Sequence, residues 1–416
     1  MNDVALKSAV VAVFGSSADF AGLHQIHNCG DQAHARLLRW LDESGMALYF
    51  LAELESTNHC DAIPGRMLRE LIHRREKNGM RMEEMFRELT RVSAALSACG
   101  VQYALIKGFS LAPEFCPNIA LRHQCDVDIL VSPADAGSAR DAVVPCGYTV
   151  EETIPDGEIR LVGPLFHLPT KRDDIYALHF QRRAEIHQSI FEKAQGVEIT
   201  VPADCLSRAE SKLIEGETFP VLCLADRFLL QCLHAFRHII GSWGRLSWLY
   251  EINYFLKLDE ADSDLWRQVA RRLSNSELKT VCGLILLLTK KLFDSPIPAE
   301  IAHCCAGTSF QRVEAWVNEF GVEWALTGME GSKSSLFLHR EFIHDLRVRR
   351  HWLRVRLLPV ERRPMLAYTR PVGIRYGFVE LKKQGIRYAE RAIFHGSALI
   401  KFASDWLRWR RALQDR

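Results

Sequence analysis

The stretch Cys125-Asp126-Val127-Asp128-Ile129-Leu130-Val131 carries two aspartates inside an otherwise apolar run. The run is short and rich in aliphatic residues, which predicts a buried β-strand. Residues i and i+2 of a strand project from the same face, so Asp126 and Asp128 point into one small volume. Two like charges on an apolar face are costly unless a cation neutralises them. The pair therefore predicts a site for Mg²⁺, which binds one or two protein carboxylates together with phosphate oxygens.

A second predicted strand precedes this one and ends in a glycine turn. Residues 101–106 form a short apolar run that leads into Lys107-Gly108-Phe109-Ser110. Glycine permits a tight turn and lets backbone N–H groups approach a phosphate. The Lys107 ammonium and the Ser110 hydroxyl can add contacts. An isolated Asp-x-Asp is more often a solvated strand end, but a strand, a glycine turn, a short helix and a strand with Asp-x-Asp form a more specific pattern.

The hydrophobic pattern changes twice along the chain. Apolar residues recur three and four apart between about 31 and 97 and again after about 225, which is typical of amphipathic helices. Between about 101 and 195 the apolar runs are short, as in strands. These patterns predict an α+β fold, a small mixed β-sheet embedded in a mainly helical protein. We expect a helical N-terminal region at 1–98, a core at 99–215, a helical domain packing on it at 216–330 and a basic helical region at 331–416.

Four short segments of the core match a known pattern. The turn reads Leu105-Ile106-Lys107-Gly108, Arg122 precedes the carboxylate strand, Gly147-Tyr148 follows the next helix, and Ala184-Glu185-Ile186-His187 lies on a later predicted strand. With these residues the chain resembles the nucleotidyltransferase superfamily, which has a DNA polymerase β-like fold, and in particular its branch of uncharacterised nucleotidyltransferases. The likeness covers roughly residues 101–256. That branch usually has Asp where this chain has Glu185, and the alternative for Glu185 is a surface strand residue.

The resemblance implies a complete set of site residues. The metal ligands, for one or two Mg²⁺ ions, would be Asp126, Asp128 and Glu185. Glu185 or His187 would accept the proton of the acceptor. The residues that would contact the phosphates are Lys107, Gly108, Ser110 and Arg122.

The resemblance also implies the reaction. Such an enzyme transfers a nucleoside monophosphate from an NTP such as ATP to a hydroxyl or similar acceptor and releases pyrophosphate. A small molecule or a peptide tailored in a biosynthetic pathway is the favoured acceptor, and a protein side chain stays open. The alternative is a binding protein on a nucleotidyltransferase scaffold that contacts nucleic acid, membrane or a protein partner without turnover, because fold does not fix function.

Cysteine usage and hydropathy bear on the compartment. Twelve cysteines are scattered along the 416 residues without a Cys-x-x-Cys pair, and several lie in apolar runs. A free thiol packs there as a small hydrophobe, so we expect reduced cysteines, no structural zinc and a cytoplasmic protein. The longest strongly apolar stretch, Thr280–Thr289, is well short of the roughly 18 residues that a membrane span needs. We therefore predict a buried helix there and no transmembrane segment.

The formal net charge of +2 conceals an asymmetry. From Arg340 to Arg416 there are nineteen Lys/Arg against seven Asp/Glu. Residues 347–356 and 406–411 interleave aromatic and cationic side chains, so an anionic partner, nucleic acid or an anionic membrane surface, can bind there. Solvated helices packed on the core are the alternative at equal weight.

His234 and His238 lie four apart on a predicted helix, where we favour packing or substrate contact over metal binding.

Overall fold

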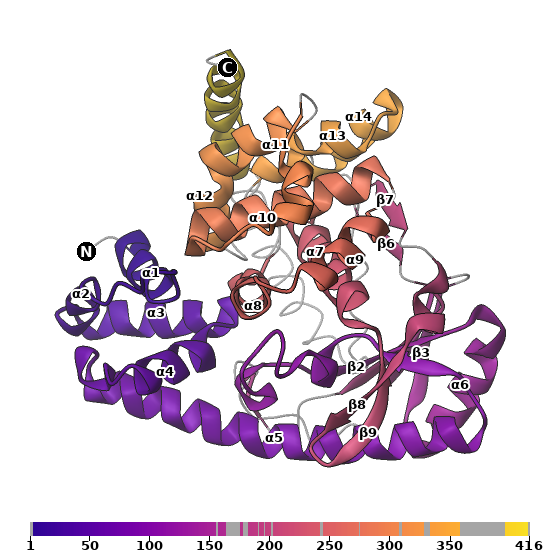
Figure 1. The fold of residues 1–416 in the computed structure, drawn as a ribbon. Coiled ribbons are helices and arrows are strands. Elements are labelled where there is room, and N and C mark those ends of the chain that lie inside the picture. The colour runs from indigo at the N-terminus through magenta and orange to yellow at the C-terminus, as the bar shows by residue number, and fades with distance from the viewer. Residues whose placement is uncertain are drawn as a thin grey trace, which may run out of the picture.

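A computed structural model describes most of the chain. The described residues are 3–154, 157–163, 175–177, 182–189, 191–194, 196–200, 203–241, 244–273, 275–307, 310–327, 333–357 and 396–414. They form a mixed β-sheet surrounded by helices, which confirms the predicted α+β class (Figure 1).

The sheet has seven strands in the order β3-β4-β5-β2-β1-β9-β8. The neighbours β2 and β5 are parallel, as are β1 and β9, and the other neighbouring pairs are antiparallel. A separate antiparallel hairpin is formed by β6 and β7. The strands are β1 (Tyr103–Leu105), β2 (Asp126–Val131), β3 (Thr149–Thr153), β4 (Glu158–Val162), β5 (Arg183–His187), β6 (Phe191–Ala194), β7 (Val197–Thr200), β8 (Glu210–Ile214) and β9 (Glu217–Val221).

The N-terminal helices end in one long helix that runs along the sheet (Figure 1). The periodicity predicts separate helices around Met67–Ile72 and Met85–Leu96, but the structure has a single helix, α5, through both. Gly79 lies between the two patterns and lowers helix propensity without breaking the helix. The Phe86 ring of α5 contacts Phe219 of β9, so the helix covers one face of the sheet. The helices are α1 (Asp3–Ala12), α2 (Leu23–His27), α3 (Asp31–Ser44), α4 (Ala47–Ser56) and α5 (Gly65–Ala98), with α6 (Ala136–Val143) inserted between β2 and β3.

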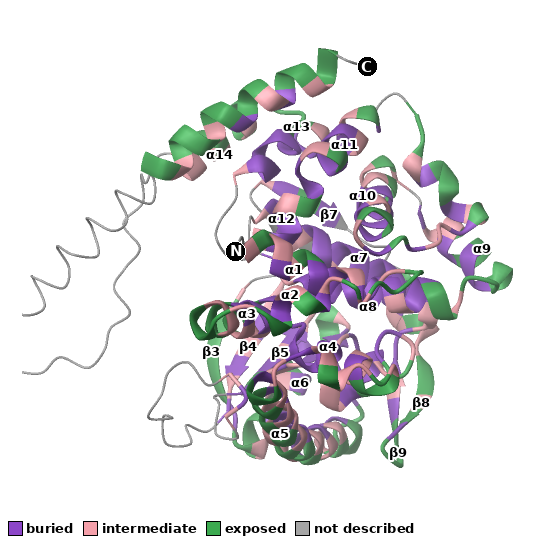
Figure 2. Ribbon diagram, turned by 90° about the vertical axis from the view of Figure 1, so that its left-hand side faces the viewer, coloured by how far each residue is buried: buried purple, intermediate pink, exposed green. Residues whose placement is uncertain are grey.

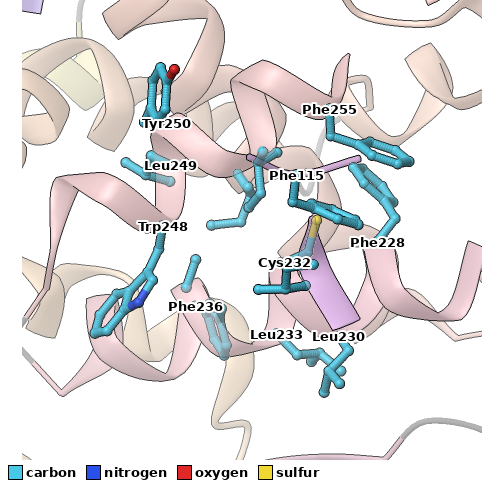
Figure 3. Packing of buried hydrophobic residues seen from close by; sticks show 14 of the residues in the cluster. Phe115, Phe228, Leu230, Cys232, Leu233, Phe236, Trp248, Leu249, Tyr250 and Phe255 are labelled. Atoms are coloured by element: carbon cyan, nitrogen blue, oxygen red, sulfur yellow. The ribbon is translucent and has the colours of Figure 1, made fainter. Parts of the chain in front are cut away.

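Two buried helices, α7 (Leu224–Ile240) and α8 (Leu246–Leu258), join the sheet to the rest of the chain. Figure 3 shows Phe228 of α7 and Phe255 of α8 beside Phe115, which comes from the segment between β1 and β2. The Phe115 and Phe255 rings stack at 4.3 Å between centroids, and those of Phe228 and Phe255 at 5.3 Å. These aromatic contacts fix the two helices against the part of the core that carries the glycine turn.

The remaining helices form the C-terminal half. The stretch Thr280–Thr289 lies inside α10 and is mostly buried, as predicted. Residues 396–414 form a largely exposed helix that ends near the C-terminus (Figure 2). Within the described ranges no helix is both long and apolar enough to cross a bilayer. The helices are α9 (Ser263–Arg272), α10 (Ser276–Phe293), α11 (Gln311–Trp316), α12 (Val322–Thr327), α13 (His339–Phe342) and α14 (Leu346–Leu357).

Candidate active site

The pairing of β2 with β5 brings three predicted site residues onto one face of the sheet. The strands are parallel, with Asp128 directly opposite Glu185 and Asp126 opposite Arg183. Side chains alternate between faces along a strand, so Asp126 shares its face with Asp128. The register therefore sets three carboxylates side by side, as the resemblance implies for Asp126, Asp128 and Glu185.

The tightest group of possible metal ligands is Asp128, Glu185 and His187. One ligand atom from each lies within 4.8 Å of the others. His187 Nε2 lies 3.0 Å from Asp128 Oδ1 and 3.7 Å from Glu185 Oε2. Carboxylate oxygens suit Mg²⁺, and a nearby imidazole also admits transition metals. The donor set fits a divalent cation, and Asp126 lies beside this group rather than inside it.

Lys107 is bound to the same carboxylate. Its Nζ lies 2.9 Å from Asp128 Oδ1, and both side chains are nearly buried. The ammonium therefore partly neutralises the cluster of carboxylates in the structure. Lys107 lines the cavity described below, so its side chain can also reach a ligand there.

The crowding of charge is visible in the pKa values of the three carboxyls. Burial, and then the Asp128 charge, raise the pKa of Asp126 and of Glu185. Burial also acts to raise the pKa of Asp128, but the Lys107 ammonium and the His187 hydrogen bond outweigh it and hold this pKa well below its ordinary value. The neighbouring positive charges outweigh burial only at Asp128, so a further cation would stabilise the charged forms of Asp126 and Glu185.

These carboxylates form the floor of a cavity of about 350 Å³. Five predicted residues line it: Lys107, Arg122, Asp126, Asp128 and Glu185. His187 contacts Asp128 without belonging to the lining. The other lining residues are His123, Gln124, Cys125, Arg183, His234, Arg237, His238, Arg245 and Trp248.

The glycine turn lies behind the cavity wall. Gly108 has φ +61°, and a Cβ there would lie 2.8 Å from Gln124 Oε1, so the turn needs glycine for its conformation and for its packing. Ser110 is fully buried, and its hydroxyl donates to the Lys107 carbonyl oxygen at 3.1 Å. The structure does not bring the Gly108 and Ser110 side of the turn to the cavity lining.

Arg122 lies in the lining but is held by buried partners. Its Nε donates to Glu251 Oε1 at 2.9 Å, and the Tyr49 hydroxyl donates to the same oxygen at 3.0 Å. Its Nη1 donates to Gln124 Oε1 at 3.1 Å. This network ties α4 and α8 to the segment that leads into β2. Arg122 therefore supports the cavity and adds positive charge to it.

Side chains of α7 and α8 form a cationic wall of the same cavity, which the sequence patterns did not identify. It includes Arg237 of α7 and Arg245 at the start of α8. Arg245 Nη1 lies 3.2 Å from His123 Nδ1, and Arg245 Nε has no hydrogen-bond partner among the described residues. Burial lowers the pKa of His123 well below its ordinary value, so this neutral imidazole adds no charge beside Arg245, whose guanidinium interacts electrostatically with Asp126 of the same lining.

The two α7 histidines lie on the same wall. The His238 ring stacks on Trp248 with 4.0 Å between centroids, and the His234 ring meets Trp248 edge-on at 4.7 Å. Burial lowers the pKa of His234 well below its ordinary value and that of His238 to about 2, so both are neutral. His234, Arg237 and His238 lie three and four apart, which places them on one helix face. The spacing could identify these three residues as cavity lining only if the face of α7 that meets the sheet were already known.

One comparison with known proteins bears on this site. The model of a family described as an uncharacterised nucleotidyltransferase matches residues 31–294, well over half of the chain. The matched segment contains all the residues of the cavity lining and ends before the C-terminal helices. No curated protein and no solved structure matches the chain.

Proposed function

The chain belongs to this family of uncharacterised nucleotidyltransferases, and on that basis we propose that it is a Mg²⁺-dependent enzyme. It would transfer a nucleoside monophosphate from an NTP to a hydroxyl or similar acceptor and release pyrophosphate. The observation that carries the proposal is the placement of Asp128 opposite Glu185 in a cavity that Arg237 and Arg245 also line.

In this proposal the carboxylates of Asp126, Asp128 and Glu185 hold one or two Mg²⁺ ions. A bound ion supplies positive charge that stabilises the attacking and leaving oxygens of the phosphoryl transfer. Asp128 and Glu185 would be the main ligands, because they have ligand atoms within 4.8 Å of each other. Asp126 would supply a further carboxylate from the same face of the sheet. His187 is a positioning residue, because its Nε2 lies within hydrogen-bond distance of Asp128 and orients that carboxylate.

The phosphates of the donor would lie between the floor and the cationic wall. Among the described residues no carboxylate forms an ion pair with the partly buried Arg245 guanidinium, which interacts with Asp126 at longer range, so an anionic ligand would stabilise its charge further. Arg237 lies on the same side of the cavity, and Lys107 could move from Asp128 to a phosphate oxygen. We therefore assign phosphate binding to Lys107, Arg237 and Arg245, with Gly108 and Ser110 shaping the turn behind them.

Proton transfer from the acceptor falls to Glu185. Its carboxylate lines the cavity, whereas His187 lies outside the lining.

A cavity of about 350 Å³ has the size of a small-molecule site. Only a narrow acceptor group can enter a cavity of this size, so we favour a small molecule or an extended peptide over a folded protein. The twelve free cysteines fit the cytoplasm as the compartment.

The proposal is tested by measuring pyrophosphate released from ATP, CTP, GTP and UTP in the presence of Mg²⁺. We expect release with one or more nucleotides when an acceptor is supplied, loss on chelation of the metal, and loss in Asp128→Asn. The exposed variant Asp141→Asn on α6 is the matched control and should keep full activity. A tenfold rise in the KM for the nucleotide in Arg245→Met would support the phosphate assignment.

A second candidate is a binding protein without turnover. The observation that favours it is the Lys107–Asp128 pair, which gives Asp128 Oδ1 an internal cation at 2.9 Å. In that case nucleotides would still raise the melting temperature, but Mg²⁺ would add nothing and no pyrophosphate would form with any nucleotide and acceptor.

A further inference from the structure

The helix at 396–414 lies outside the segment that matches the family and has a fixed orientation on the protein. Arg408 Nε lies 2.8 Å from Glu319 Oε1, and Arg408 Nη1 lies 3.2 Å from Glu323 Oε2. Trp409 is buried, and its ring stacks on Phe337 at 5.7 Å between centroids. These contacts anchor one face of the helix, so the opposite face points outward (Figure 2).

The outward face carries exposed aliphatic side chains, and the half-exposed Trp406 lies at its edge, where its ring contacts Phe337 at 6.0 Å between centroids. Ile400 is 76% exposed, Leu407 is 56% exposed and Trp406 is 47% exposed. Ile400 and Leu407 are seven residues apart, as are Leu399, Trp406 and Leu413, so the two rows run side by side along the helix. Leu399 and Leu413 are also exposed. Contiguous exposed apolar side chains of this kind mark an interaction surface.

Arginines flank this apolar strip, and no exposed acid balances them among the described residues of the two helices. Helix α14 carries five arginines and no acidic residue. The acid of the helix at 396–414, Asp405, is buried and paired with Lys401 and Arg408. Between the two helices lies a groove of about 740 Å³, which Arg349 and Arg410 line together with apolar side chains. The surface is therefore both cationic and apolar.

We propose that α14 and the helix at 396–414 bind the surface of an anionic phospholipid membrane. The exposed side chains of Ile400 and Leu407 enter the boundary between headgroups and acyl chains, and the arginines contact the phosphates. Nucleic acid would match the charge but not the exposed aliphatic rows. A second copy of this chain would match the aliphatic rows but would bring like charges together. The membrane accounts for both properties and needs no spanning segment.

The test is co-sedimentation of the full chain with vesicles. One set is pure phosphatidylcholine and the other contains 30% phosphatidylglycerol in order to supply negative charge. We expect binding to the anionic vesicles that weakens as salt is raised, and little binding to the neutral ones. The double variant Ile400→Ser/Leu407→Ser should bind anionic vesicles roughly tenfold more weakly, because two apolar side chains no longer insert. Arg350→Glu/Arg354→Glu on α14 should weaken binding by at least the same factor.

Matched controls separate this surface from the rest of the molecule. Leu213→Ser on β8 removes another exposed aliphatic side chain, and Arg271→Glu on α9 reverses another exposed arginine. Both should bind like the unaltered chain. The proposal is overturned if the anionic vesicles do not bind, or if Ile400→Ser/Leu407→Ser binds them unchanged. It is also overturned if the chain is a dimer in solution that this double variant converts to a monomer.

Discussion

The strand Asp126–Val131 and the turn Lys107–Ser110 come from the same stretch of sequence, but the structure uses them differently. The strand delivers both of its aspartates to the cavity. The turn delivers Lys107 alone and directs Ser110 into the core, where its carbonyl oxygen accepts from Lys212 and Arg227 at 2.9 Å each.

The difference follows from how each element orients its side chains. A strand alternates strictly, so the face of Asp128 is set as soon as one neighbour is known to be buried. A turn has no such period, and the direction of each side chain depends on local φ and ψ and on tertiary contacts. We therefore expect substitutions on the strands to change catalysis and substitutions at Gly108 and Ser110 of the turn to change mainly stability.

The largest effect is expected on the strand side, at Glu185. Glu185→Gln removes a charged metal ligand, so pyrophosphate release should fall by roughly a hundredfold to a thousandfold. Glu185→Asp keeps the charge and should stay within roughly tenfold of full activity. Initial rates at saturating nucleotide measure both. Glu217→Gln, an exposed carboxylate on β9, is the control. If Glu185→Gln and this control release pyrophosphate at equal rates, Glu185 is not part of the active site.

Lys107 belongs to the turn but contacts the strand, and its removal should be the most costly for stability. Lys107→Met leaves the buried Asp128 carboxylate without its cation, which should lower the free energy of unfolding by about 3 kcal/mol. Saturating Mg²⁺ should restore much of this loss, because it binds the folded site. Urea unfolding with and without Mg²⁺ measures both quantities.

Lys212→Met is the control for the stabilisation of Lys107→Met by Mg²⁺. Lys212 pairs with Glu114 outside the cavity lining, so its loss should also destabilise the chain, but Mg²⁺ should stabilise this variant no more than it stabilises the unaltered chain, in which Lys107 still pairs with Asp128. If Mg²⁺ stabilises both variants equally, the ion does not compete with Lys107 for Asp128.

Two glycines with similar backbone conformations test the packing of the turn. Gly108 has φ +61° and Gly100 has φ +67°, so alanine at either position is strained by about 1 kcal/mol. At Gly108 the new Cβ would also meet Gln124 Oε1, which Arg122 holds, whereas nothing lies within 4 Å at Gly100. Urea denaturation should therefore show a loss about 1 kcal/mol larger for Gly108→Ala than for Gly100→Ala. Equal losses would mean that Gln124 moves freely.

The smallest effect on activity is expected at Ser110. Ser110→Ala removes a buried hydroxyl that donates to the Lys107 carbonyl oxygen, at a cost of about 1 kcal/mol in unfolding free energy. The KM for the nucleotide should stay within about twofold, since this hydroxyl does not line the cavity. If the KM for the nucleotide rises tenfold without a change in kcat, the Ser110 hydroxyl binds the phosphates.

The sequence predicts the parts of this molecule whose periodicity is regular. The α+β class is confirmed, and Thr280–Thr289 is in a helix, because apolar spacing reports which face of an element is buried. The facing of Asp126 and Asp128 follows from strand alternation. The pairing of Asp128 with Glu185 needs tertiary structure, since 57 residues separate them and no local rule fixes the register.

The cationic wall was missed for a related reason. Arg237 and Arg245 lie on helices with many buried residues, and nothing local distinguishes them from arginines on a solvated face. Their position opposite the carboxylates depends on how α7 and α8 pack across the sheet. The single helix α5 differs from the two predicted helices because burial of residues on both sides of Gly79 outweighs the low helix propensity of glycine.

A crystal structure of the chain with Mg²⁺ and a non-hydrolysable NTP analogue would test the central claim most directly. The account predicts an ion bound by Asp128 and Glu185, the Lys107 ammonium displaced from Asp128 toward a phosphate, and the phosphates against Arg245. Phosphates bound at Ser110, or a Lys107–Asp128 pair that persists without an ion in the fully loaded crystal, would contradict it.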